Sequence, residues 1–309
     1  MLLVANGSVF TRNAQTPFIP NGAVAIDGDM IVEVGPECEL KSKYPDAEYV
    51  DARGNLIMPG LINCHTHIYS GLARGLAIKG CNPTNFLENL EQQWWKIDDN
   101  LTLDGTNASA YATILDSIRD GVTTIFDHHA SFCEIPGSLF TIKDAAQELG
   151  MRSCLCYEVS DRRGQEKCDQ AIAENAEFAQ WAAKERRDND NHMIAAMPNV
   201  GWCEAMTMLF ENNAKMASKY FDRKLGVLEP GAAADVIVMD YKPFTPLSEE
   251  NIDGHMLFGM MGKNCRTTII NGRVLYKDRE FVGIDEDKIN AWTMAESKKL
   301  WSTLNDRAY

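Results

Sequence analysis

Hydrophobic and polar positions along the chain follow three successive rhythms. The first is a series of short apolar runs separated by turn residues, which is typical of β-strands. The strands expected from it are Leu2–Val4, Ala23–Ile26, Ile31–Val34 and Tyr49–Val50. Asp27-Gly28 supplies a hairpin turn between the second and third strands. The pattern therefore predicts a β-sandwich or meander at the start of the chain.

From about Ile57 the rhythm changes to a strand followed by a helix, repeated. The expected strands are Leu61–His65, Val122–Asp127, Met151–Val159 and Met193–Met197. Helical periodicity covers 104–119, 141–149 and 166–186. Gly121 and Gly150 follow two of these stretches as helix-stopping residues. Alternating strands and helices indicate a parallel α/β sheet.

A further helix is expected over Trp202–Tyr220, after which the β rhythm returns. Its strands are expected at Val236–Met239, Thr267–Ile270 and Val274–Tyr276, and an amphipathic helix follows over Asp285–Leu304. Asn271-Gly272 is a strong hairpin signal. We predict that residues 1–56 and 223–284 pair into one composite β-sandwich. A barrel-type region, 57–222, is then inserted between them, and 285–309 form a C-terminal helix.

Two histidines close the first strand of the βα region. Residues i and i+2 of a strand point to the same face, so His65 and His67 can present two imidazoles to one point. Neutral imidazole is the usual nitrogen ligand of Zn²⁺. Two histidines spaced in this way also occur by chance, hydrogen-bonded in a loop, so the pair alone is weak evidence for a metal site.

The run that contains this pair resembles the first-strand signature of the amidohydrolase superfamily, in which a Pro-Gly-Leu-Ile turn precedes the metal-binding histidines. The matching residues are Met58, Pro59, Gly60, Leu61, Ile62, Asn63, His65 and His67. The segment from Leu225 to Asp235, with Asp240, is similar to the family's return into the sandwich, and Gly254-His255, Thr268–Gly272 and Tyr276 continue the likeness. The resemblance implies a (β/α)8 TIM-type barrel and a divalent metal, zinc first and iron second.

Within the superfamily, the chain resembles most closely the aminohydrolase group called SsnA, which is associated with selenium metabolism and related to chlorohydrolases and guanine-type deaminases of the ATZ/TRZ-like branch. The likeness is carried by Trp94-Trp95, by Asp127 to Ser131, and by Glu158 with Asp161-Arg162. It implies hydrolytic removal of an amine or chloride from a small heterocycle or amidine by metal-activated water.

Three further groups of residues are candidates for the site. Strand alternation puts His128 and His129 on opposite faces, so at most one faces the barrel interior, and the pattern does not say which. Glu158 is a candidate for proton transfer, although a carboxylate at a strand end is more often solvated. Trp94 and Trp95 are candidates for a pocket wall, although aromatic residues on a helix usually pack in the core. His192 is expected to be structural or exposed.

The chain departs from the family in length. A (β/α)8 barrel needs about 250 residues, whereas Ile57 to Tyr220 holds roughly 165 and shows about four βα units. The family's later histidine ligand, catalytic glutamate and strand-eight aspartate have no matching positions in this chain. The seam, the point at which the central segment of the family's barrel is missing, is expected near Met197–Pro198. These 309 residues alone are therefore expected to show no appreciable turnover. The alternative is a non-catalytic structural or interaction protein, or a purely structural metal clip.

The composition of the chain argues against two classes of binding partner and indicates reduced cysteines. A net charge of −14 argues against nucleic acid and anionic membrane surfaces, which bind through Lys and Arg. Nine scattered cysteines without a CxxC pair favour reduced thiols, and we expect a cytoplasmic protein. Cys154 and Cys156 are expected to be buried. A small-molecule substrate and a homodimer are expected, and in the non-catalytic alternative the dimer would form through unpaired strand edges.

Overall fold

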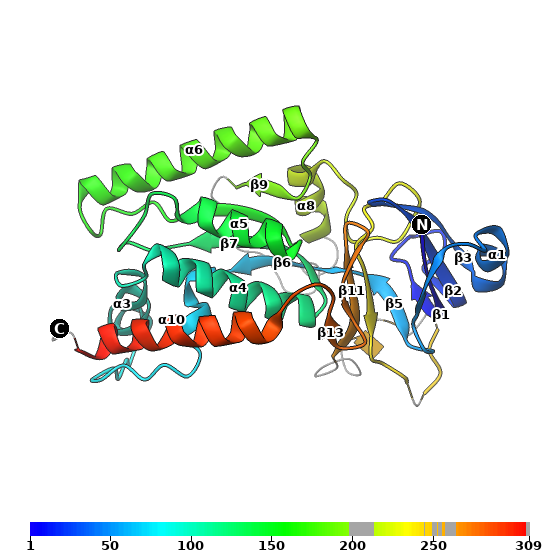
Figure 1. Cartoon of the computed structure of the whole chain (residues 1–309), viewed down its shortest axis with the longest axis horizontal. Coiled ribbons are helices and arrows are strands. Elements are labelled where there is room, and N and C mark those ends of the chain that lie inside the picture. The colour runs from blue at the N-terminus through cyan, green and yellow to red at the C-terminus, as the bar shows by residue number, and fades with distance from the viewer. Residues whose placement is uncertain (198–212, 244, 249–251, 253–254, 257–263, 307–309) are drawn as a thin grey trace. The chain divides into compact units, whose positions relative to one another are not determined.

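The computed structural model describes residues 1–197, 213–243, 245–248, 252, 255–256 and 264–306. They form an α/β fold (Figure 1). Its strands are β1 Leu2–Phe10, β2 Phe18–Asp27, β3 Met30–Pro36, β4 Glu48–Asp51, β5 Leu56–Pro59, β6 Leu61–Thr66, β7 Val122–His129, β8 Arg152–Tyr157, β9 Ile194–Ala196, β10 Val236–Met239, β11 Cys265–Ile270, β12 Arg273–Lys277 and β13 Glu280–Phe281. Its helices are α1 Glu37–Lys43, η1 Ile68–Ala73, α2 Phe86–Asn89, η2 Leu90–Trp94, α3 Trp95–Asp98, α4 Leu103–Arg119, α5 Ser138–Leu149, α6 Gln165–Asn189, α8 Asn213–Phe221 and α10 Glu286–Asp306.

One sheet of nine strands takes strands from both ends of the chain. Its order is β13-β12-β11-β10-β5-β1-β2-β3, and β4 pairs with β1. The junction is the antiparallel pair β5–β10, in which Leu56 lies opposite Met239 and Pro59 opposite Val236. The two chain ends are therefore tied by backbone hydrogen bonds between strands that are far apart in sequence.

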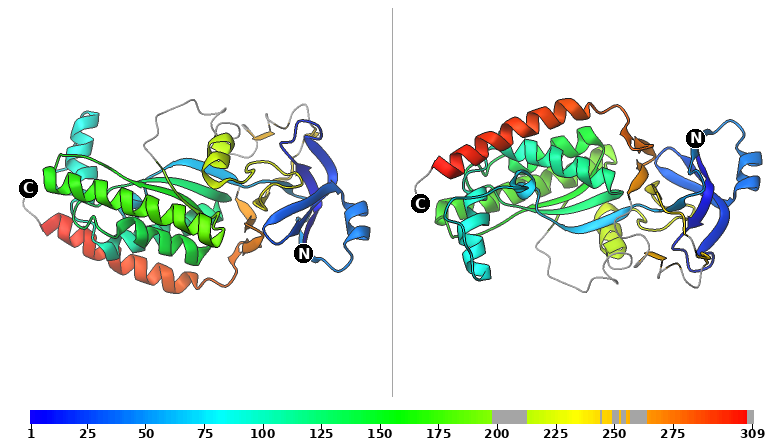
Figure 2. Two further views of the ribbon diagram at one scale, coloured as in Figure 1. Left: turned by 90° about the horizontal axis from the view of Figure 1, so that it is seen from above. Right: turned by 90° about the horizontal axis from the view of Figure 1, so that it is seen from below.

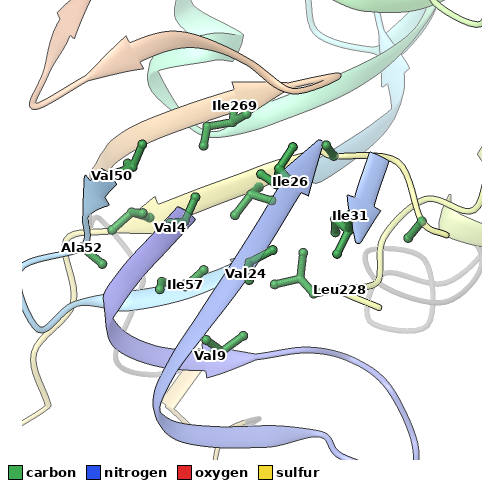
Figure 3. Packing of buried hydrophobic residues seen from close by; sticks show 14 of the residues in the cluster. Val4, Val9, Val24, Ile26, Ile31, Val50, Ala52, Ile57, Leu228 and Ile269 are labelled. Atoms are coloured by element: carbon green, nitrogen blue, oxygen red, sulfur yellow. The ribbon is translucent and has the colours of Figure 1, made fainter. Parts of the chain in front are cut away.

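Apolar side chains of this sheet form a continuous core (Figure 3). Val4, Val24, Ile57, Val236 and Ile269 are all fully buried in it. Burying one such side chain contributes about 1.5–3 kcal/mol. These residues come from both ends of the chain. Their burial, like the β5–β10 pairing, therefore stabilises the association of the two chain ends in one sheet.

A second sheet of four strands has the order β6-β7-β8-β9. Strands β8 and β9 are parallel, with Ser153 opposite Ile194 and Leu155 opposite Ala196. Every residue of β8 is buried, as expected for a strand covered on both faces. Helices α5 and α6 pack against β8 and against each other (Figure 2).

The chain divides into two compact units. One comprises Met1–Asn63, Ser117–Thr124 and Cys203–Gly283, and the other comprises Cys64–Asp116, Ile125–Trp202 and Ile284–Tyr309. The ends of β6 and β7, all of β8 and β9, and helix α10 belong to the second unit. The candidate site residues that follow all lie in this second unit.

The strands and helices expected from the sequence are present, with boundaries shifted by a few residues; β1 is the exception, running to Phe10. The helix expected over Trp202–Tyr220 is described only from Asn213, and Pro198 of the expected seam lies outside the described residues. Helices α1, α2 and α3 were not expected. The composite sandwich and the four-unit partial barrel, as separate domains, stay predictions. Within the described residues no helix is long and apolar enough to cross a membrane.

Candidate metal centre

The two histidines at the end of β6 face each other. His65 lies near the end of the strand and His67 directly follows it, where the chain turns into η1. Their Nε2 atoms are 3.1 Å apart, and their ring centroids are separated by 4.6 Å at an interplanar angle of 88°. The i, i+2 spacing has therefore placed two ring nitrogens at one point, as the strand period requires.

A hydrogen bond sets the tautomer of His67. Its Nδ1 lies 3.1 Å from the backbone oxygen of His128. A carbonyl oxygen only accepts, so Nδ1 carries the hydrogen and donates it. In the neutral ring, Nε2 is then the atom with the lone pair, and it is the atom that faces His65. A ring N–H donated to a backbone carbonyl is the usual outer contact of a metal-binding histidine.

Electrostatics favours the neutral form of His65. Partial burial, and then the neighbouring His67, lower the pKa of His65. Metal ligation requires the unprotonated imidazole, so this shift favours the binding-competent form at neutral pH.

His128 and His129 lie in different surroundings at the end of β7. The His128 ring is T-shaped against His67, with centroids 5.8 Å apart. Burial lowers the pKa of His128, Glu158 opposes that shift, and His67 and His65 lower it further. The structure thus brings His128, rather than His129, to the histidine pair.

His129 is fully buried and belongs to a separate hydrogen-bonded group. The Ser131 hydroxyl donates to the Glu134 backbone oxygen, so it accepts from Nε2–H of His129, at 3.0 Å. Burial lowers the pKa of His129 to about 3, which keeps the ring neutral. The backbone N–H of Ser131 also donates to the Tyr157 hydroxyl, which fixes the loop after β7.

Asp127 holds the turn that follows β6. Its Oδ1 accepts from the backbone N–H of Ile68, at 2.6 Å. Burial raises the pKa of the carboxyl to about 8, against the lowering effect of that hydrogen bond. The contact links the end of β7 to the residue directly after His67, so Asp127 helps to set the position of the pair.

Glu158 belongs to a cluster of three charged side chains that differ in solvent exposure. Arg162 Nη2 lies 2.6 Å from Asp98 Oδ2 and 3.3 Å from Glu158 Oε1. The exposed side-chain fractions are 2% for Asp98, 10% for Arg162 and 28% for Glu158, so the cluster runs from a buried anchor to a solvent-facing carboxylate. The backbone N–H of Glu158 also donates to the His129 oxygen, at 2.8 Å, which places Glu158 beside the end of β7.

The two tryptophans make different contacts. Trp94 ends η2, a π-helical turn, and packs on a core cluster that includes Leu72 and Ile97. Its ring is also T-shaped against Tyr69. Trp95 begins α3, and the Arg162 guanidinium lies 5.2 Å from its ring centre. π-helical turns occur often at functional sites. The pocket-wall role of both residues stays a prediction.

The sequence pattern missed Tyr69 and Asp98. Tyr69 lies two residues after His67, and its ring contacts both His67 and His129. Burial raises the pKa of its hydroxyl.

His192 is buried and paired with Asp190, at 2.7 Å, and Cys154 and Cys156 are buried free thiols, as expected. Among the described residues, no three His, Cys, Asp or Glu side chains are already arranged to hold a metal ion.

A cavity of about 560 Å³ lies in the second unit, at the ends of β8 and β9. It is bordered by Tyr157, Ala196 and Met197 of the sheet side and by Ile172 and Ala179 of α6. None of the predicted metal or catalytic side chains lines it. The histidine pair, not this cavity, is where the chemistry-bearing groups meet.

The profile of the amidohydrolase family matches residues 56–220, slightly more than half of the chain. The chain belongs to the amidohydrolase family. The match begins with β5, at Leu56, and so includes the histidine pair. Residues 22–47 also match an imidazolonepropionase-like composite domain of bacteria.

Curated relatives of this amidohydrolase are named as deaminases. It is 29% identical over 184 residues to the 5'-deoxyadenosine deaminase of Methanococcoides burtonii, covering 59% of this chain and 39% of that protein. It is 26% identical over 192 residues to a 5-methylthioadenosine/S-adenosylhomocysteine deaminase of Bacillus cereus, covering 62% and 41%. The aligned part of the chain thus spans about two fifths of the length of these relatives.

Solved structures agree on the fold. The atrazine chlorohydrolase TrzN of Arthrobacter aurescens, complexed with zinc, superimposes with a TM-score of 0.67 at 17% identity, covering 96% of this chain and 100% of that chain. An adenosine deaminase of Xanthomonas campestris with bound zinc gives 0.68 at 14% identity, covering 97% and 98%. At such low identity the likeness supports the fold alone.

Proposed function

We propose that this amidohydrolase family member is a metal-dependent hydrolase of non-peptide C–N bonds, of the deaminase or chlorohydrolase type, acting on a small heterocyclic or amidine substrate. The observation that supports this most strongly is the pair of facing Nε2 atoms of His65 and His67, with the far nitrogen of His67 donating to a backbone carbonyl. The names of the curated relatives support the deaminase type.

The geometry of the pair fits a transition metal. Two nitrogens 3.1 Å apart, each about 2.0–2.1 Å from a common ion, subtend an angle of about 100°, close to tetrahedral. His65 and His67 would hold the ion, and imidazole nitrogens suit zinc first, with iron as the alternative. When bound, a divalent metal supplies the Lewis acidity that activates water at neutral pH.

Glu158 is the proposed proton carrier. It is the most solvent-exposed member of its charge cluster and is ion-paired with Arg162, at 3.3 Å. In deamination, a carbon–oxygen bond to water forms and the carbon–nitrogen bond breaks. The Glu158 carboxylate accepts a proton from the water and returns it to the departing amine, so that ammonia leaves. His128, whose ring lies against His67, is the residue proposed to orient the reacting groups.

The non-catalytic alternative also has a supporting observation. The described residues contain no ready group of three metal ligands, and a catalytic zinc usually has three. A structural protein that retains the histidine pair as a metal clip would fit that finding. This alternative predicts bound zinc without turnover, whereas the hydrolase predicts both. A cytoplasmic location and a homodimer stay predictions.

The test is an assay of ammonia release across purines, pyrimidines and triazines, and of chloride release from chlorotriazines, with zinc-loaded protein. In contrast to the expectation of no turnover drawn from the missing barrel half, the hydrolase predicts release that requires zinc and is lost in His65→Ala but kept in His192→Ala. Zinc binding without release of either product from any compound would support the non-catalytic alternative. Release that persists in His65→Ala would contradict the proposed site.

A further inference from the structure

We propose that Arg162 is a positioning residue for Glu158 and holds its carboxylate in place for proton transfer. The inference rests on the proposed function, in which Glu158 accepts the proton and returns it. Neither residue is proposed to touch the metal ion. Arg162 is not proposed to touch the substrate either, so its effect on the reaction passes through Glu158 alone.

A single nitrogen of Arg162 faces two carboxylates. Nη2 donates to Asp98 Oδ2 at 2.6 Å and forms an ion pair with Glu158 Oε1 at 3.3 Å. Asp98 is almost fully buried, so the short hydrogen bond anchors the guanidinium inside the protein. The same nitrogen then presents positive charge to the more exposed Glu158. The orientation of the guanidinium on Asp98 therefore fixes where the charge that faces Glu158 lies.

Two aromatic rings border the guanidinium of Arg162. Its central carbon lies 4.1 Å from the ring centre of Phe132 and 5.2 Å from that of Trp95. Within the described part of the chain, its Nε and Nη1 are buried and make no hydrogen bond. A planar guanidinium stacks on aromatic faces, whereas a lysine ammonium is a compact point charge that does not. The site is thus shaped for arginine and not merely for a positive charge.

The loop that carries Glu158 and Arg162 is attached at several points. Arg163, the next residue, pairs with Asp99 at the end of α3. The backbone N–H of Glu158 donates to the His129 oxygen at 2.8 Å, beside the end of β7. Glu158 is therefore held through its backbone by β7 and through its carboxylate by Arg162. A reacting group that is held in this way loses rate steeply when it is misplaced, by roughly 10²-fold for 1 Å.

A purely structural role for Arg162 makes a different prediction from a positioning role. Loss of a structural residue would lower the rate to the same extent whether or not Glu158 is present. Loss of a residue that acts through Glu158 has no further effect once Glu158 has been replaced, because residues that act as a unit are not additive.

The first experiment is a double-mutant cycle on ammonia release. It uses the zinc-loaded chain and the purine, pyrimidine or triazine that the parent chain deaminates fastest. Arg162→Lys keeps the charge and loses the planar group, so kcat should fall by roughly 10–100-fold while KM changes less than about twofold. In a Glu158→Gln background, Arg162→Lys should lower kcat no further. Arg163→Lys is the matched control and should change kcat by less than about twofold.

The second experiment needs neither metal nor turnover. Amide hydrogen exchange of the metal-free chain, followed by NMR, reports how often the Glu158 N–H leaves the His129 oxygen. Arg162→Lys should speed exchange of the Glu158 amide by about 10-fold or more, and the amides within β8 should keep the parent rates. Arg163→Lys should change the Glu158 amide by no more than about twofold.

The outcomes separate this inference from the proposed function. An equal fall in kcat with and without Glu158, or the same Glu158 amide exchange in Arg162→Lys and Arg163→Lys, would overturn the positioning role. A parent chain that releases no ammonia would overturn the proposed function instead, and the amide exchange would still decide whether Arg162 holds Glu158. Urea unfolding of each variant confirms that it is folded under the assay conditions.

Discussion

Arg162 donates through Nη2 to Asp98 Oδ2 at 2.6 Å, joining a loop that follows β8 to the end of α3 across 64 residues of sequence. The guanidinium also lies 4.1 Å from the ring centre of Phe132. Both charged side chains are almost fully buried. The next residue pair along the chain, Arg163 with Asp99, makes the same kind of contact at the surface.

Arg162→Ala is expected to lower the free energy of unfolding by about 2–4 kcal/mol, since a hydrogen bond to a charged group contributes roughly 1.5–3 kcal/mol and the ring contact adds to it. Arg163→Ala is the matched control and should cost less than about 1 kcal/mol, as exposed ion pairs do. Urea unfolding of both variants is the measurement. Equal losses would show that burial of the Arg162–Asp98 pair contributes nothing.

Glu174 predicts a pH dependence of stability. It accepts from the backbone N–H groups of Gly137 and Leu139 at the start of α5. Burial raises the pKa of this carboxyl, the two hydrogen bonds oppose that shift, and Glu177 adds to it. A carboxyl whose folded-state pKa is raised contributes most to stability below its ordinary value and loses that contribution as pH rises through the folded value.

Glu174→Gln, which cannot ionise, should therefore gain stability relative to the parent chain as pH rises above about 4.5. Unfolding free energies measured in urea from pH 4.5 to 8 give the difference between the two proteins. Glu166→Gln, an exposed position on the same helix, should give a flat difference. If the difference in unfolding free energy between Glu174→Gln and the parent chain also does not change with pH, the raised pKa of Glu174 is ruled out.

Replacing Gly272 by alanine is predicted to cause a local steric clash. Its φ is +76°, and an added Cβ would lie 1.8 Å from the Gly28 backbone oxygen. Gly283 has a similar φ of +74° with open space around it. Gly283→Ala should cost about 1–2 kcal/mol from conformation alone. Gly272→Ala should cost about 1–3 kcal/mol more, because backbone must move. Thermal or urea unfolding that ranks the two equally would contradict the close approach of these turns.

Glu158→Gln tests the proposed proton carrier. It should lower the rate of ammonia release by roughly 10²–10⁴-fold, the usual contribution of general acid–base catalysis. Zinc content should change little, because Glu158 is not proposed to touch the ion. Steady-state rates and metal analysis of the same preparation are needed. An unchanged rate in a zinc-dependent enzyme would remove Glu158 from the mechanism.

The sequence predicted the parts of the site that depend on local periodicity. The two-residue period of a strand is enough to place His65 and His67 on one face, and the turn residues at Gly28 and Gly272 were visible as dipeptides. The choice between His128 and His129 was not predictable. It depends on which face of β7 meets the end of β6, and that is a tertiary relationship.

Asp98 and the π-helical turn before it were missed for related reasons. The partner of Asp98 lies 64 residues away, so no spacing rule connects them. A π-helical turn differs from an α-helix by one hydrogen-bond step, and the apolar pattern of Leu90–Trp94 does not reveal it. Trp94 and Trp95 were recognised as candidates, but their different contacts, with Tyr69 and with Arg162, depend on partners distant in sequence.

The central claim is that His65 and His67 bind a catalytic metal, and X-ray absorption at the zinc edge of the purified, zinc-loaded chain tests it most directly. We predict one zinc per chain with imidazole nitrogens at about 2.0–2.1 Å, and loss of that zinc in His65→Ala but not in His192→Ala. A chain that takes up no zinc, or whose zinc shows no imidazole scattering and is unchanged in His65→Ala, would contradict the account.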